Sequence, residues 1–180
     1  PSGTNLYSAN GVALTTYMGQ VVIFFPDNST NQIACAISGT PMPDGPSDWS
    51  ENTGVVDPYD SGAFGTPGPI SAVNVNGTFC WAYPSFNSSE LFFDSGQMNS
   101  DQFNVPVWLI GNPVAGSAAN LFSDGTQVYL SYVADGGAIN LQSLPLVLNG
   151  GNGGTWQGTP QIISNQSSDY APSGTVVDGQ

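Results

Sequence analysis

The 180-residue chain contains 13 aspartate and glutamate residues but no lysine, arginine or histidine, so its formal net charge is −13 at pH 7. This composition excludes a Ser-His-Asp triad, a Schiff-base lysine, a histidine metal ligand and an arginine clamp. It also leaves no basic side chain to hold nucleic acid or an anionic membrane surface. The remaining chemistry suits sugar binding, calcium binding, carboxylate-only catalysis or a structural role.

The length fits a single domain spanning residues 1–180. A hydrophobic content of 39%, with 23 glycines and 14 prolines, indicates many short strands joined by turns around a real core. No helical periodicity is sustained along the chain, which favours an all-β fold. No apolar stretch approaches about 18 residues, so we expect no membrane insertion.

Three segments share one pattern in chain order: a strand, a glycine turn, a second strand, a polar turn and a third strand. The turns are centred on Gly19, Asn76-Gly77 and Asp124-Gly125. Asn-Gly and Asp-Gly are strong hairpin signals, because a type I′ turn needs a positive φ at both central residues. A tryptophan follows each third strand after a delay of about 15 residues: Trp49, Trp108 and Trp156.

A unit of about 50 residues with four short strands is typical of a propeller blade. The sequence therefore predicts about three four-stranded, β-propeller-like repeats at approximately 11–57, 69–114 and 117–163. A single β-sandwich is the alternative, because all hairpins share these features.

The aromatic strand, the Asp/Asn/Gly turn, the apolar strand and the delayed tryptophan resemble the repeats of fungal fucose-specific lectin-type β-propellers over residues 11–160. The resemblance implies sugars bound between neighbouring blades by an aromatic platform, a carboxylate and an arginine. This chain departs from that pattern because it has no arginine. The family's fucose contact therefore does not carry over intact.

Three blades do not close a ring, since propellers typically have four to eight. We therefore expect a homo-oligomer. Two chains would join into a six-bladed ring, or contacts that do not close would build a filament.

A sugar site needs an aromatic face for the pyranose ring and acceptors for its hydroxyl groups. Trp49 with Asp48 and Glu51 offers this combination in a proline-rich stretch, and Trp108 and Glu90 are further candidates. The alternative is that Trp49 and Trp108 plug the edges of their repeats and that Glu90 is a solvated edge residue. Trp81 and Tyr83 share one strand face and are expected in the core.

The sequence predicts no cofactor, and calcium is the one metal that its Asp and Asn oxygens would suit. Asp27-Asn28 and Asp124 are the candidates. Neither segment has the spacing of an EF-hand, and ordinary turn chemistry explains both.

Two carboxylate-only enzymes are alternatives to a non-catalytic protein. Asp60-Ser61-Gly62 and Asp94-Ser95-Gly96 resemble the signature of aspartic peptidases, whose two carboxylates share a proton. The triplets lie too close in a chain too short for that fold. A glycosidase pair would be Glu51 and Glu90, which nothing in the sequence brings together.

Cys35 and Cys80 are predicted to form a disulfide, with two buried thiols as the alternative. Four sequons predict N-glycosylation, at Asn28, Asn76, Asn87 and Asn165. These features and the composition favour an extracellular, secreted protein. Taken together, they predict a non-catalytic, lectin-like protein that binds glycans, with a self-assembling fibre or coat subunit as the alternative.

Overall fold

The computed structural model describes residues 11–27, 32–52, 69–84, 91–97, 108–110, 119–134, 137–145, 161–168, 172–174 and 177. Within these residues the secondary structure consists of twelve β-strands and one short 3-10 turn. The strands form three antiparallel sheets of four strands each. The prediction of an all-β chain is therefore confirmed.

Each sheet is built from four strands that follow one another in the sequence. The first contains β1 (Ala13–Tyr17), β2 (Gln20–Asp27), β3 (Gln32–Ser38) and β4 (Trp49–Asn52), with the 3-10 turn Pro46–Asp48 before β4. The second contains β5 (Ser71–Val75), β6 (Thr78–Pro84), β7 (Leu91–Gln97) and β8 (Trp108–Ile110). The third contains β9 (Asn120–Ser123), β10 (Gln127–Val133), β11 (Ala138–Pro145) and β12 (Gln161–Ser167).

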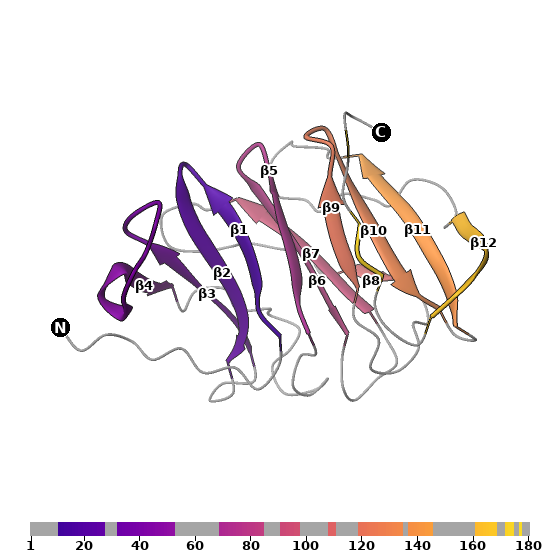
Figure 1. The fold of residues 1–180 in the computed structure, drawn as a ribbon, viewed down its shortest axis with the longest axis horizontal. Coiled ribbons are helices and arrows are strands. Elements are labelled where there is room, and N and C mark those ends of the chain that lie inside the picture. The colour runs from indigo at the N-terminus through magenta and orange to yellow at the C-terminus, as the bar shows by residue number, and fades with distance from the viewer. Residues whose placement is uncertain are drawn as a thin grey trace.

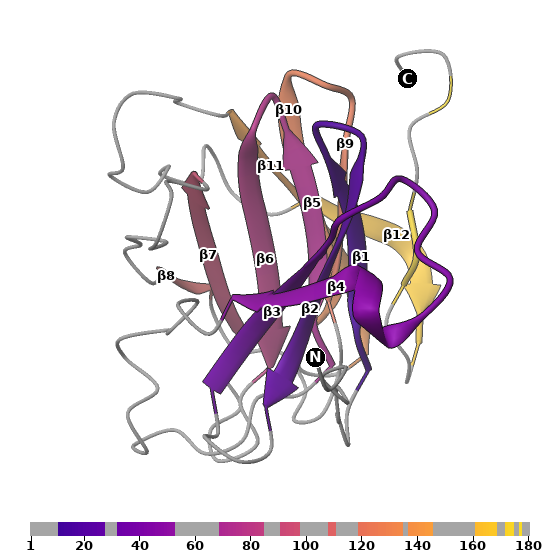
Figure 2. The ribbon, with the colours of Figure 1, turned by 90° about the vertical axis from the view of Figure 1, so that its left-hand side faces the viewer.

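The three sheets stand side by side in chain order (Figure 1). β1 contacts β5 and β5 contacts β9, so the first strands of the three sheets are neighbours. Seen from the side of the first sheet, the sheets lie one behind another (Figure 2). The described residues thus form an open series of three sheets and no closed ring.

Tight turns connect the first and second strands of each sheet, and all three turns lie at the same end of the molecule (Figure 1). In the second sheet, Asn76 and Gly77 both have positive φ values, of 52° and 87°, as a type I′ turn requires. In the third sheet, Ser123 pairs with Val128, so the loop has four residues, and Gly125 has a φ of 91°. The hairpin predicted at Asp124-Gly125 is present, but it is wider than a two-residue turn.

Aromatic side chains fill the interface between the first and second sheets. Phe79, Trp81 and Tyr83 point from β6 toward the first sheet, where they meet residues such as Phe24. The rings of Phe24 and Trp81 stack with their centroids 5.4 Å apart. Trp81 is only 1% exposed, which confirms that it belongs to the core. Each such side chain contributes about 1.5–3 kcal/mol through burial.

The alternate residues of β6 pack into the interface between the second and third sheets. Cys80 and Ala82 point toward the third sheet, where they pack with a cluster that includes Leu130 and Tyr132. Every residue of β6 is therefore buried, because the strand has a packed sheet on each side. This explains why its sequence is apolar throughout instead of alternating.

The disulfide predicted between Cys35 and Cys80 is wrong. Cys35 lies in the cluster between the first and second sheets, and Cys80 lies in the cluster between the second and third. Both residues are buried thiols in the structure, as the alternative held. Burial raises the pKa of the Cys35 thiol to about 12.

Candidate functional site

The loop between β3 and β4 is shaped by residues that cannot continue a strand. Pro41, Pro43 and Pro46 lack the backbone N–H that a sheet ladder needs. The loop closes at its base, where the N–H of Gly39 donates to the carbonyl oxygen of Asp48 at 2.6 Å. Pro46 occupies the first turn of the 3-10 segment, a position that tolerates the missing N–H. The loop is therefore a closed structure anchored on the first sheet.

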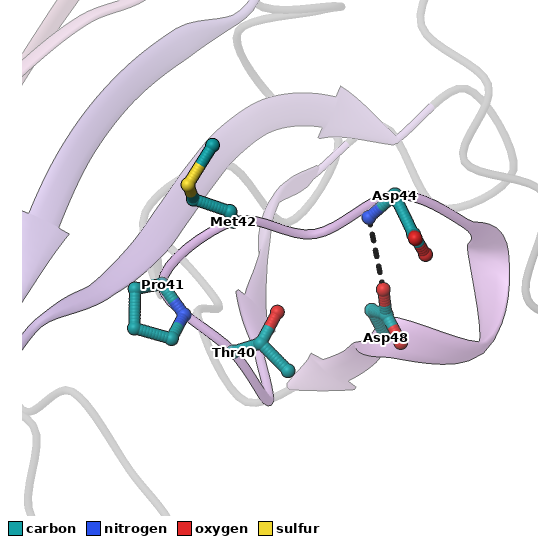
Figure 3. A pocket seen from close by; sticks show the side chains of 5 residues that line it. All are labelled: Thr40, Pro41, Met42, Asp44 and Asp48. Carbon is teal, nitrogen blue, oxygen red and sulfur yellow. Dashed lines mark hydrogen bonds between the residues drawn. The ribbon is translucent and has the colours of Figure 1, made fainter.

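An open pocket of about 450 Å³ lies in this loop, a volume within the range of small-molecule sites. Its lining residues are Thr40, Pro41, Met42, Asp44 and Asp48. Figure 3 shows Thr40, Pro41 and Met42 along one arm of the loop, with the two aspartates across from them. The pocket therefore combines carboxylates and a hydroxyl group with apolar surface.

Asp48 is held in place by the loop itself. Its Oδ2 atom accepts a hydrogen bond from the backbone N–H of Asp44 at 2.9 Å. This bond is the main cause that lowers the pKa of Asp48 below its ordinary value. The side chain is therefore a fixed carboxylate at neutral pH, suited to accept hydrogen bonds from a ligand.

Of the predicted Asp48-Trp49-Glu51 site, the structure places Asp48 and Trp49 in different surroundings. Asp48 lines the pocket, whereas Trp49 is partly buried against the cluster formed by Phe25, Ala34 and Ala36. The backbone of Glu51 pairs with Ala36, and its side chain lies outside the described residues. The position of Trp49 agrees with the alternative that it plugs the edge of its repeat.

Most other predicted site residues lie wholly or partly outside the described residues. Trp108 pairs with Phe93 at the start of β8, but its side chain lies outside the described residues, as does all of Glu90. The peptidase candidate Asp60 lies outside them too, and only the backbone of Asp94 is described, opposite Trp81. Among the residues that the structure describes, Asp48 is the one predicted site residue that lines the pocket.

Asp124 stabilises the turn in which it lies. Its Oδ1 atom accepts hydrogen bonds from the N–H groups of Thr126 and Gln127, both at 2.8 Å, and from the Thr126 hydroxyl at 2.7 Å. Its Oδ2 atom accepts from the Tyr129 hydroxyl at 2.8 Å. These bonds, led by that from Gln127, lower the pKa of Asp124 and explain the residue through turn chemistry.

The other calcium candidate is only partly visible. Asp27 ends β2 with its side chain outside the described residues, and Asn28 lies beyond them. Among the side chains that the structure describes, no three from aspartate, glutamate, cysteine or histidine gather as metal ligands would.

The structure likewise describes only some of the four sequon asparagines. Asn76 is exposed at a hairpin turn, and Asn165 lies on β12 with an undescribed side chain. Asn28 and Asn87 lie outside the described residues.

Comparison with models of known protein families and with curated protein sequences found no match to the chain. In the part of the chain that the structure describes, no helix is long and apolar enough to cross a membrane.

The sequence did not point to Thr40, Met42 or Asp44 as site residues. Their one signal is the dense proline, glycine and aspartate content of residues 39–48, which predicts a loop. That this loop folds back on itself depends on the bonds to Asp48, which composition does not specify.

Proposed function

We propose that this protein is a non-catalytic, extracellular carbohydrate-binding protein whose site is the pocket in the β3–β4 loop. The observation that carries the proposal is the fixed carboxylate of Asp48, which lines an open pocket beside Asp44 and the apolar side chains of Pro41 and Met42. Sugars present both hydroxyl donors and apolar C–H faces, so they match such a lining.

The chemistry of the whole chain supports this class of ligand. With no lysine, arginine or histidine, the protein has no side-chain cation for a phosphate or carboxylate ligand. Hydrogen-bond acceptors without neighbouring cations are best suited to a neutral ligand that carries many hydroxyl groups. The resemblance of the sequence repeats to those of lectin-type propellers favours the same class of ligand, and the three four-stranded sheets that follow in chain order are compatible with it.

Binding is favoured over hydrolysis by the state of Asp48. A glycosidase needs one carboxylic acid whose pKa is raised so that it can protonate the leaving group. The hydrogen bond from the Asp44 N–H shifts the pKa of Asp48 in the opposite direction. Asp48 is therefore suited to accept hydrogen bonds and not to donate a proton.

Two substitutions in the pocket test the proposal. Asp48→Asn keeps an oxygen for the Asp44 N–H but removes the charge, so glycan affinity should fall about tenfold or more. All proteins in this comparison are made in bacteria, because this substitution also creates a sequon with Ser50. Met42→Asn removes apolar surface from a side chain that is 87% exposed. Met18→Asn is its matched control, because Met18 is 85% exposed, lies in another loop, and has a positive φ that asparagine tolerates.

The measurement is a glycan array with the purified protein, with and without calcium, followed by titration of any sugar bound. Selective binding that weakens in Asp48→Asn and Met42→Asn but not in Met18→Asn supports the pocket. Binding unaffected by the pocket variants would place the sugar site elsewhere, and a blank array at high protein concentration would reject the lectin function.

A structural subunit is the second candidate, and one observation favours it. β12 is the last strand of the third sheet and contains no charged residue, and Ile162 on it is 64% exposed. An uncharged edge strand can pair with a strand of another chain. By contrast, Phe25, Ala34 and Ala36 on the outer face of the first sheet are already buried, which favours a filament over a closed six-bladed ring.

A further inference from the structure

The turn between β5 and β6 holds one of the four sequons, Asn76-Gly77-Thr78, in a defined conformation. Asn76 is exposed at the tip of the hairpin. Its Nδ2 atom donates one hydrogen bond, to the carbonyl oxygen of Gly125 at 3.1 Å. An amide nitrogen carries two hydrogens, so one N–H remains outside this bond.

Thr78, the hydroxyl residue of this sequon, is poorly explained by the fold. It is 8% exposed, and its Oγ1 atom is buried with no hydrogen-bond partner. A buried hydroxyl without a partner destabilises the folded chain, whereas valine would place a methyl group in the same space. The fold alone therefore favours valine at position 78.

A sequon, in contrast, requires a hydroxyl residue two positions after the asparagine. We infer that Asn76 is an N-glycosylation site of this protein and that the hydroxyl of Thr78 serves its modification and not the folded structure. This inference is independent of any sugar binding at the β3–β4 loop.

The chemistry is a glycosyl transfer from a lipid pyrophosphate oligosaccharide. A bond forms between Nδ2 of Asn76 and C1 of the first sugar, and the bond from C1 to the pyrophosphate oxygen breaks. The lipid pyrophosphate leaves with that electron pair, and one Nδ2 proton passes to a base of the transferase. The remaining N–H is sufficient for the bond to Gly125.

The burial of Thr78 also sets the order of events. Once β6 has packed between the neighbouring sheets, the Thr78 hydroxyl is no longer accessible to a transferase. The transfer therefore has to precede the closure of the hairpin into the fold. The glycan would then project from the end of the molecule that carries the three hairpin turns (Figure 1).

The test has two arms that use the full chain. In the first, the chain is secreted from a eukaryotic host and cleaved at aromatic residues, since trypsin has no site in it. Mass spectrometry of the peptide containing residue 76, before and after enzymatic removal of N-glycans, gives the occupancy. Thr78→Val should abolish occupancy at Asn76, and Thr78→Ser, which keeps the sequon, should retain it.

In the second arm, the same variants are made without glycans in bacteria. Thr78→Val should raise the midpoint of thermal unfolding by about 2–4 °C, because it removes the unsatisfied hydroxyl. Thr78→Ser should lower the midpoint, because it keeps the hydroxyl and loses the methyl group. An unmodified Asn76 in the secreted chain would overturn the inference, and so would a lower midpoint in Thr78→Val.

Discussion

At the scale of single residues, the buried thiol of Cys35 shows how packing controls chemistry. Cys35 is fully buried among the residues between the first and second sheets, and this burial raises its pKa to about 12. A thiol must ionise to act as a nucleophile. In the folded protein Cys35 is therefore a small apolar core residue.

This shift predicts a loss of stability at alkaline pH. The unfolded chain ionises Cys35 above its ordinary pKa, whereas the folded chain keeps the proton up to about pH 12. The folded state therefore keeps its full stability below the ordinary pKa of the thiol. Above that pKa, the free energy of unfolding falls by about 1.4 kcal/mol per pH unit. The free energy of unfolding in urea, measured from neutral to alkaline pH, should fall more steeply for the wild type than for Cys35→Ala. Equal slopes would contradict the prediction.

The sequence pointed to one residue that lines the pocket, Asp48, but not to the group of residues around it. Asp48 was a candidate because a carboxylate next to a tryptophan suits a sugar, and it does line the pocket. Its neighbour Trp49 points into the cluster on the outer face of the first sheet. Adjacent residues separate in this way when a chain enters a strand, and the sequence did not reveal which of the two would face solvent.

At the scale of elements, the glycine turns were the strongest part of the prediction. Two of the delayed tryptophans mark the start of a strand: Trp49 and Trp108 are the first residues of β4 and β8, the fourth strands of their sheets. The third repeat differs, since β12 begins at Gln161 and its pairing with β11 shifts register. A bulge of this kind depends on long-range pairing, so local patterns do not predict it.

The turn at Gly125 gives a prediction that isolates backbone strain. Gly125 has a φ of 91°, and a Cβ added there would meet no atom within 4 Å. Gly125→Ala should therefore destabilise the protein by about 1–2 kcal/mol through its backbone conformation alone. Gly45→Ala is the control, because Gly45 has an extended φ of −156° and a Cβ added there would meet only the Ser47 hydroxyl oxygen, at 4.0 Å. Thermal unfolding of both variants checks this, and equal stability would show that the turn tolerates a side chain.

At the scale of the whole molecule, charge opposes association between copies of the chain. Every ionised side chain at neutral pH is negative, so two approaching copies of the chain repel each other. Added salt screens this repulsion, and lowering the pH to about 4 weakens it, because roughly half of the carboxylates are then protonated. The apolar, uncharged surface of β12 can therefore act as a contact only where screening or protonation permits.

We therefore expect assembly to be weakest at neutral pH and low salt and to increase with added salt or as the pH is lowered to about 4. Ile162→Asp places a charge on the edge strand β12 and should suppress assembly, since an edge carrying charge resists pairing. Leu14→Asp is the matched control: Leu14 is 62% exposed, close to the 64% of Ile162, but lies on β1 beside β5. Sedimentation velocity and electron micrographs of the three proteins separate the effect of position from that of added charge. Equal assembly in the wild type and Ile162→Asp would remove β12 as the contact, and with it the observation that favours a filament.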